Sequence, residues 1–238
     1  MLRVYFDNAA TTPISEEVIN TMLPVLRNQF GNPSSIHAEG RSVRAVVESA
    51  RKTVAQCIGA STSEIFFTSG GTESNNMAIK CAVRDLGVRR IISSPTEHHC
   101  GLHAIECVEH VNGVEVVWLP VDRLGRIDMH ELEKALVDSA GVKTLVSLMH
   151  ANNEIGTIQP IEAIGTLCHE KGVLFHTDAV QGAAHMDLDF TKGVIDMASF
   201  SAHKFHGPKG VEILYARQGI ELESLIEGGA QERGKRAG

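Results

Sequence analysis

The sequence predicts an α/β protein with a mostly parallel sheet that helices cover on both faces. Short apolar runs, typical of buried strands, alternate along the chain with helical patterns of about ten residues or more. No internal repeat, low-complexity tract or linker interrupts this alternation. Strands and helices in this order imply crossover connections between parallel strands, so we expect a short N-terminal segment, 1–15, followed by one large domain, 16–238.

Two helices are expected at the start of the large domain. Ser15 is the predicted N-cap of the first, which reaches about Phe30 and is expected to bend at Pro24. The loop GNPSSIH separates it from a second helix over 38–58. The predicted apolar face of the second helix contains Val43, Val46, Val47, Ala50 and Val54.

Strands and helices then alternate to the end of the chain. The predicted strands are EIFFT, RRIISS, VEVVWLPV, KTLVSLMH, VLFHTDAV, DMASFSAH and VEILYAR. Further helices are expected after the glycine pair Gly70–Gly71, over 99–111, from the N-cap Asp128 and from Pro160.

Composition excludes several classes of function. The chain has 238 residues and a net charge of −7, which argues against nucleic acid as a partner because phosphate binding requires a basic face. No apolar run approaches the roughly 20 residues that cross a bilayer. The five cysteines are odd in number and form no CxxC pair, which favours the reducing cytoplasm over a disulfide framework.

Two residues with distinctive chemistry follow predicted strands, at the sheet edge where α/β proteins bind ligands. Lys204 comes just after DMASFSAH and precedes a turn rich in Gly and Pro. A partly desolvated lysine has a lowered pKa and is a usable nucleophile. Asp178 lies in VLFHTDAV, and its burial would require a partner, either an arginine or a protonated ring nitrogen of a ligand.

Other strand ends allow alternative interpretations. The turn SGGTESNN opens a helix near Thr72 that could seat a phosphate on free N–H groups, although an ordinary capped turn explains it as well. His98 lies nearest its strand end, where its ring could stack on a ligand. Asn152 and Asn153 fit either a turn or a binding role.

A metal site is a further alternative. His99 and His103 are four residues apart and could share a helix face, but neither a third ligand nor an HExxH motif accompanies them. An amine, a carboxylate and a phosphate seat on one sheet edge instead match pyridoxal 5′-phosphate (PLP). This cofactor needs a lysine for its aldehyde, an acid facing its ring nitrogen and a cradle for its phosphate.

Six segments in register resemble the cysteine desulfurases of the NifS/IscS type, within the class-V aminotransferase group. They are YFDNAATTP, FTSGGTESNN, PTEHH, MHANNEIG, HTDAVQ and FSAHKFHGPKG. The resemblance extends from about Tyr5 to Gly238. It implies the PLP-dependent transferase fold type I (aspartate-aminotransferase-like), with the large domain only, and PLP as the cofactor.

The resemblance also implies a role for each site residue. Lys204 would carry the cofactor covalently and shuttle the substrate α-proton, His98 would stack on the ring and assist proton transfer, and Asp178 would pair with the ring nitrogen. Asn153 and Gln181 would lie near the phenolic oxygen. The residues implied to hold the phosphate are Gly71, Thr72, Ser201 and His203.

The implied reaction removes sulfur from L-cysteine to give L-alanine and an enzyme persulfide. The persulfide would supply sulfur-acceptor or iron–sulfur scaffold proteins, from a cytoplasmic homodimer. The alternatives are a selenocysteine lyase or another class-V enzyme, a cofactor-free scaffold for iron–sulfur assembly, and a metal hydrolase built on His99 and His103.

The expected sulfur acceptor is not found in this sequence. In the family, a cysteine and a substrate-binding arginine belong to a small C-terminal domain, which we expect to be absent from this chain. None of the five cysteines matches that position, and Cys100 is interpreted as structural. The chain alone is therefore expected to be incomplete for catalysis.

Overall fold

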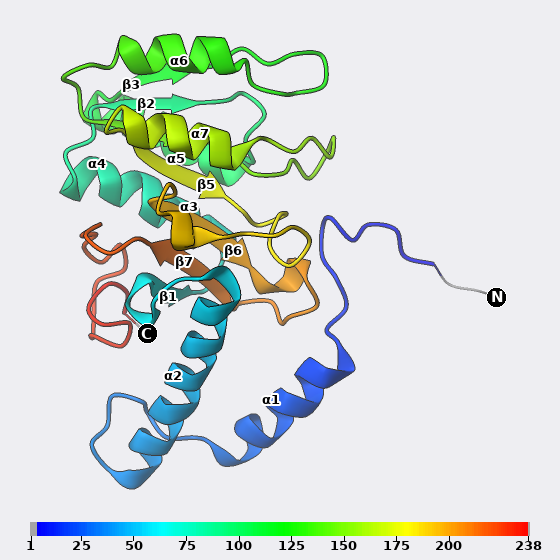
Figure 1. Ribbon diagram of the computed structural model, residues 1–238. Coiled ribbons are helices and arrows are strands. Elements are labelled where there is room, and N and C mark those ends of the chain that lie inside the picture. Colours follow the sequence, from blue (N-terminus) through cyan, green and yellow to red (C-terminus); the bar gives the residue numbers. More distant parts are fainter. Residues whose placement is uncertain (1–3, 238) are drawn as a thin grey trace.

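A single seven-stranded sheet forms the centre of the protein (Figure 1). The computed structural model describes residues 4–237, so residues 1–3 and 238 of the two predicted segments lie outside the described part. The strands are β1 (Ile65–Thr68), β2 (Arg90–Ser93), β3 (Glu115–Trp118), β4 (Thr144–Ser147), β5 (Leu174–Asp178), β6 (Met197–Ser201) and β7 (Glu212–Ala216). Each lies within a run predicted to be a strand.

The sheet is mixed, with a parallel majority. The strand order is β1-β7-β6-β5-β4-β2-β3, and the pairs from β6 to β3 are all parallel. Strand β7 runs antiparallel to both β6 and β1, so β1 points in the same direction as β6. The prediction of a mostly parallel sheet is confirmed. The carboxyl ends of β1, β2, β4, β5 and β6 consequently share one edge.

In residues 4–237, seven α-helices connect and flank these strands. They are α1 (Glu16–Asn28), α2 (Ala38–Ile58), α3 (Gly71–Asn76), α4 (Ala82–Asp85), α5 (His99–Asn112), α6 (Met129–Val137) and α7 (Ile161–Glu170). A π-helical turn, Met77–Cys81, joins α3 to α4. Ser15 and Asp128 accept hydrogen bonds from the first turns of α1 and α6, which confirms both predicted N-caps. Within residues 4–237, no helix is long and apolar enough to cross a membrane.

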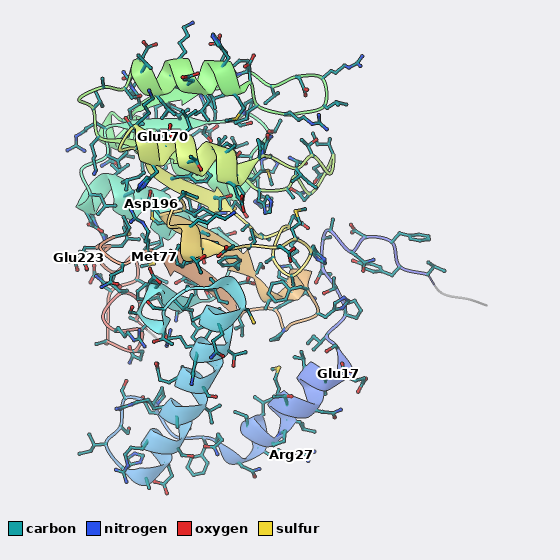
Figure 2. All side chains as sticks on the ribbon, in the orientation of Figure 1. Glu17, Arg27, Met77, Glu170, Asp196 and Glu223 are labelled. Atoms are coloured by element: carbon teal, nitrogen blue, oxygen red, sulfur yellow. The ribbon has the colours of Figure 1, made fainter. Side chains whose placement is uncertain are left out.

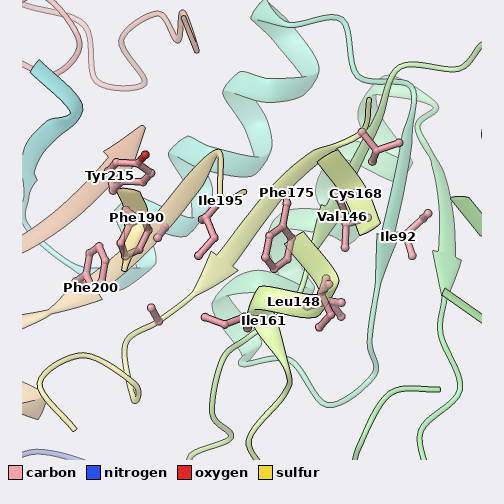
Figure 3. Packing of buried hydrophobic residues seen from close by; sticks show 14 of the residues in the cluster. Ile92, Val146, Leu148, Ile161, Cys168, Phe175, Phe190, Ile195, Phe200 and Tyr215 are labelled. Atoms are coloured by element: carbon pink, nitrogen blue, oxygen red, sulfur yellow. The ribbon is translucent and has the colours of Figure 1, made fainter. Parts of the chain in front are cut away.

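Each face of the sheet has its own hydrophobic core, because successive strand residues point to opposite faces. Val146 and Phe175 pack with residues of α6 and α7 on one face (Figure 3). Their neighbours Leu145 and Leu174 pack against α4, α5 and the π-helical turn on the other. Helices therefore cover both faces, as predicted, and the strands between them are held rigidly.

The predicted second helix over 38–58 is confirmed, but its apolar face is only partly covered. None of Val43, Val46, Val47, Ala50 and Val54 is fully buried, whereas Gly40, Arg51 and Ala55 are. The physical reason is that much of α2 extends beyond the sheet, and only its C-terminal part reaches β1 (Figure 1). Helix α1 likewise has no buried residue, and the side chains of Glu17 and Arg27 lie apart from the sheet (Figure 2).

A buried ion pair fixes α2 to the C-terminal part of the chain. Arg51 is 1% exposed, and its two terminal nitrogens donate to the Glu232 carboxylate at 2.7 and 2.9 Å. Arg51 also donates to the carbonyl of Ile65, and the backbone N–H of Phe67 donates to Glu232. The pair thus anchors both α2 and residue 232 to strand β1.

Replacement of Arg51 by Met is expected to destabilise the protein by about 3 to 5 kcal/mol, because the Glu232 carboxylate would remain buried without its counter-charge. Chemical denaturation measures this loss. The double variant R51M/E232Q should recover part of it, since a neutral amide oxygen still accepts from the Phe67 N–H. Equal stabilities of the single and double variants would contradict the account.

Candidate active site

All nine residues predicted from the sequence line one cavity at the carboxyl edge of the sheet. They come from the loops and helix starts after β1, β2, β4, β5 and β6. The residues are Gly71, Thr72, His98, Asn153, Asp178, Gln181, Ser201, His203 and Lys204. The direction of the strands explains this convergence, because these five strands all have their carboxyl ends at this edge.

Asp178 is the buried acid of the cavity. It ends β5, is 7% exposed, and accepts hydrogen bonds from the Val180 backbone N–H at 3.0 Å and from Asn75 Nδ2 at 2.6 Å. Burial raises the pKa of its carboxyl group despite these two donors. No salt bridge in residues 4–237 joins Asp178 to a Lys, Arg or His side chain. The arginine partner considered from the sequence is therefore wrong.

Lys204 lies in a 3-10 turn, Ala202–Lys204, directly after β6. Its Nζ donates to the backbone carbonyls of Ala9 at 2.6 Å and Ala10 at 2.9 Å. Partial burial lowers the pKa of Lys204, although Asp178, Glu212 and Asp7 favour its charged form. The amine is thus held beside the cavity with increased access to its neutral, nucleophilic form.

The two carbonyls that accept hydrogen bonds from Lys204 belong to the DNAATTP segment, residues 7–13. Gln181 Nε2 also donates to the Ala9 carbonyl, at 2.8 Å. Thr12 Oγ1 donates to the carbonyl of His203 at 2.9 Å and accepts from the backbone N–H of His206 at 2.7 Å. These contacts fix residues 9–12 along the lysine loop, so the N-terminal segment helps to hold Lys204 and Gln181 in place beside the cavity. Residues 4–7 are irregular.

The start of α3 presents backbone N–H groups to the cavity. Gly70 is the N-cap residue and supplies no side-chain hydrogen bond, so the first N–H groups remain available to a ligand. The Glu73 carboxylate does not line the cavity, because it accepts a hydrogen bond from Arg236 Nε at 2.8 Å. Gly71, Thr72 and the neighbouring Ser201 thus offer donors to an anion.

His98 is the N-cap of α5, and the bond that it makes defines its tautomer. Its Nδ1 accepts from the backbone N–H of Cys100 at 3.2 Å, which places the proton of the neutral ring on Nε2. Asn153 is half-buried at the cavity wall and donates to Glu154 at 2.7 Å. Both side chains are exposed enough to meet a ligand.

Sequence reasoning missed four residues of the cavity: Asn75, Cys100, Met149 and Val180. Asn75 stands in the quoted motif GGTESNN, and its place one helical turn after Gly71 was the available signal. Cys100, interpreted as structural, also faces the cavity. Its sulfur lies 3.1 Å from Asn75 Nδ2 and 2.9 Å from His98 Nδ1.

The alternative metal pair has no further ligand. The rings of His99 and His103 are neighbours, with centroids 5.6 Å apart. The described part of the chain contains no group of three or more His, Cys, Asp or Glu residues that could hold a metal ion. The hydrolase alternative therefore gains no support here.

The fold defines the class of protein: an α/β protein with the PLP-dependent transferase fold. Residues 4–234 match the aminotransferase class-V family, and the chain belongs to this family of PLP-dependent enzymes. The structure is similar to that of a NifS-like protein, with a TM-score of 0.93 and 44% sequence identity over 100% of this chain and 65% of that one.

Within the family, the chain is similar to cysteine desulfurases. It is 50% identical to the cysteine desulfurase IscS of Dictyoglomus turgidum over 99% of this chain and 59% of that relative. It also resembles the structure of SspA in complex with cysteine, with a TM-score of 0.91, 40% identity, and coverage of 99% of this chain and 68% of that one. The chain thus spans about three fifths of the length of the curated relatives it matches.

The lowered pKa of Lys204 predicts an unusual pH profile. In cofactor-free protein, reductive methylation by formaldehyde should reach its half-maximal rate at a lower pH for Lys204 than for Lys192. Only the neutral amine reacts, and Lys192 has a raised pKa because it bonds to Glu162. Peptide mass spectrometry measures both rates in one sample. An equal or higher midpoint for Lys204 would refute the inferred desolvation.

Proposed function

We propose that this chain carries the cofactor-binding part of a cysteine desulfurase. The observation that carries the proposal is the convergence of Lys204, Asp178 and the open start of α3 on one cavity. The similarity to cysteine desulfurases over nearly the whole chain supports it. Neither the cavity nor these relatives favours a selenocysteine lyase or another class-V activity.

The residues present fit PLP. Asp178 is a buried acid that forms no salt bridge within residues 4–237, and a protonated ring nitrogen would supply a cationic partner. The N–H groups that begin α3 would receive the phosphate together with Ser201 and His203. Lys204 presents an amine to the aldehyde, and Asn153 and Gln181 would lie beside the phenolic oxygen. His98 would cover the ring face.

The chain's own residues would also handle the substrate proton. When bound, PLP supplies an electron sink that stabilises negative charge at the substrate α-carbon. Lys204, with its lowered pKa, would accept and return the proton at that carbon. His98 would provide a second proton-transfer group, because its side chain lines the cavity while its Nδ1 accepts from the Cys100 N–H. Asp178 would keep the ring nitrogen protonated.

The sulfur acceptor is proposed to lie outside these 238 residues. Cys100 is the cysteine in the cavity, but burial and the charge of Asp178 raise the pKa of its thiol. A raised pKa disfavours the thiolate, which is the form that attacks sulfur. Cys100 is also held between Asn75 and His98. A cysteine on a separate, mobile segment would suit the transfer better.

We further propose a cytoplasmic homodimer that passes sulfur to acceptor or iron–sulfur scaffold proteins. Apolar side chains left exposed on the N-terminal segment, α1 and the following loop support an association with further polypeptide. They include Phe6 (90% exposed), Leu26 (73%), Phe30 (85%) and Ile36 (88%). The position of the domain boundary near residue 16 remains part of this proposal.

The protein at its natural length should release alanine and sulfide from L-cysteine in the presence of a thiol reductant. Lys204→Ala should lower the rate about 100- to 10,000-fold, since it removes the group that binds the cofactor and moves the proton. Lys192→Ala is the matched control, because Lys192 is exposed, forms a salt bridge with Glu162 and is not among the residues that line the cavity. Alanine release measures turnover.

Covalent attachment of the cofactor to Lys204 provides a second test of the same proposal. Borohydride treatment of the PLP-loaded protein should leave the cofactor mass on the peptide containing Lys204 and not on that of K204A. Retention of the label by K204A, or absence of any label from the wild type, would contradict the assignment. Faster turnover of L-selenocysteine with no release from L-cysteine would favour the lyase.

A further inference from the structure

Asn75 connects the start of α3 to the buried acid of the cavity. It is 1% exposed, lines the cavity, and donates from Nδ2 to Asp178 Oδ2 at 2.6 Å. The same nitrogen lies 3.1 Å from Cys100 Sγ. Because an amide oxygen in this place would repel the carboxylate, the amide orientation is determined by Asp178. Asn75 Oδ1 is buried and has no hydrogen-bond partner in residues 4–237.

The two hydrogen-bond donors to Asp178 differ in how far they fix the orientation of its carboxylate. The Val180 N–H belongs to the turn that follows β5 and bonds to Oδ1 at 3.0 Å, as in any local turn. Within the described residues, Asn75 is the residue whose side chain donates a hydrogen bond to this carboxyl group, and it lies on α3 whereas Asp178 ends β5. Two bonds to two different oxygens fix the plane of the carboxylate, whereas the local bond alone leaves it free to rotate.

The charges around Asp178 make this orientation important. Burial and the negative charge of Asp178 together raise the pKa of Glu97, from the loop after β2, and of Cys100, on α5. His98 and Lys204 interact favourably with it from α5 and the loop after β6. Asn75 contributes a neutral donor that favours the ionised acid without adding a cation to compete with a ligand.

We propose that Asn75 is a positioning residue of the cofactor site, whose amide holds the Asp178 carboxylate ionised and facing the cavity. The inference rests on the proposed function, because the group that Asp178 faces is the PLP ring nitrogen. Cys100 completes the arrangement, since its sulfur contacts the same amide nitrogen and limits rotation of the Asn75 side chain. A buried asparagine that only joined α3 to β5 would not affect the ring nitrogen.

Substitution of Asn75 tests the proposal in the protein at its natural length. Asn75→Leu keeps the approximate volume and removes the donor, and Asn75→Ser provides a second variant with a hydroxyl too short to reach Asp178. Asn112→Leu, at the exposed end of α5, is the matched control. Circular dichroism and thermal unfolding establish which variants fold.

Two readouts separate positioning from packing. The PLP dissociation constant, from absorbance titration of cofactor-free protein, should rise about 10- to 100-fold in N75L and N75S and remain unchanged in N112L. The nitrogen chemical shift of ¹⁵N-labelled PLP bound to each protein should move toward the unprotonated value in the Asn75 variants. Borohydride should still fix the label on Lys204.

The outcomes distinguish this inference from the proposed function. Wild-type affinity and an unchanged nitrogen shift in the folded Asn75 variants would overturn the inference, although the wild type still released alanine. A wild type that bound no PLP would overturn both. A weakened affinity with a shifted nitrogen signal supports the positioning role, whatever the rate of desulfuration.

Discussion

The burial of one carboxyl group, that of Asp178, is the constraint on which the site depends. A carboxylate at the end of a buried strand loses hydration, which costs several kcal/mol without compensation. Here the Val180 N–H and Asn75 compensate in part, yet the pKa of the acid remains raised. The Asp178 carboxyl group can therefore accept a cationic partner in the cavity. Lys204, His98 and the start of α3 line the same cavity.

The sheet explains how these groups come together. Six of the seven strands end at the same edge, so residues separated by more than 100 positions, such as Asn75 and Asp178, become neighbours. The two cores on opposite faces hold the strands rigidly beneath the cavity. Lys204 is located by a short turn after β6 and by the carbonyls of Ala9 and Ala10. Rigid elements thus supply the precision that a cofactor site requires.

Most of the fold was predictable because the spacing of apolar residues along the chain differs between strands and helices. The strand ends also identified Lys204 and Asp178, since a lysine and an acid after apolar runs are uncommon. The antiparallel direction of β7 was not predictable, because strand direction depends on pairing and not on local pattern. The partial burial of the apolar face of α2 was not predictable for a similar reason: periodicity gives an apolar face but does not show how much of the sheet lies beneath it.

Contacts between distant segments account for the rest of the missed features. Asn75 and the Ala9 carbonyl reach the site only through tertiary structure, and both were seen in motifs without a role. The partner of Asp178 was left open between an arginine and a ligand, and the structure excludes an arginine within the described residues. The chain belongs to the aminotransferase class-V family. Because it covers about three fifths of the length of its curated relatives, the complete reaction is a proposal.

The most direct test is a titration of the Asp178 carboxyl group itself by ¹³C NMR, with D178N used to assign its signal. The account predicts a pKa above the ordinary aspartate value in cofactor-free protein and a marked fall when PLP is bound, because the ring nitrogen then supplies the missing positive charge. A pKa that is ordinary at the outset, or that does not change when PLP occupies the cavity, would contradict the central claim.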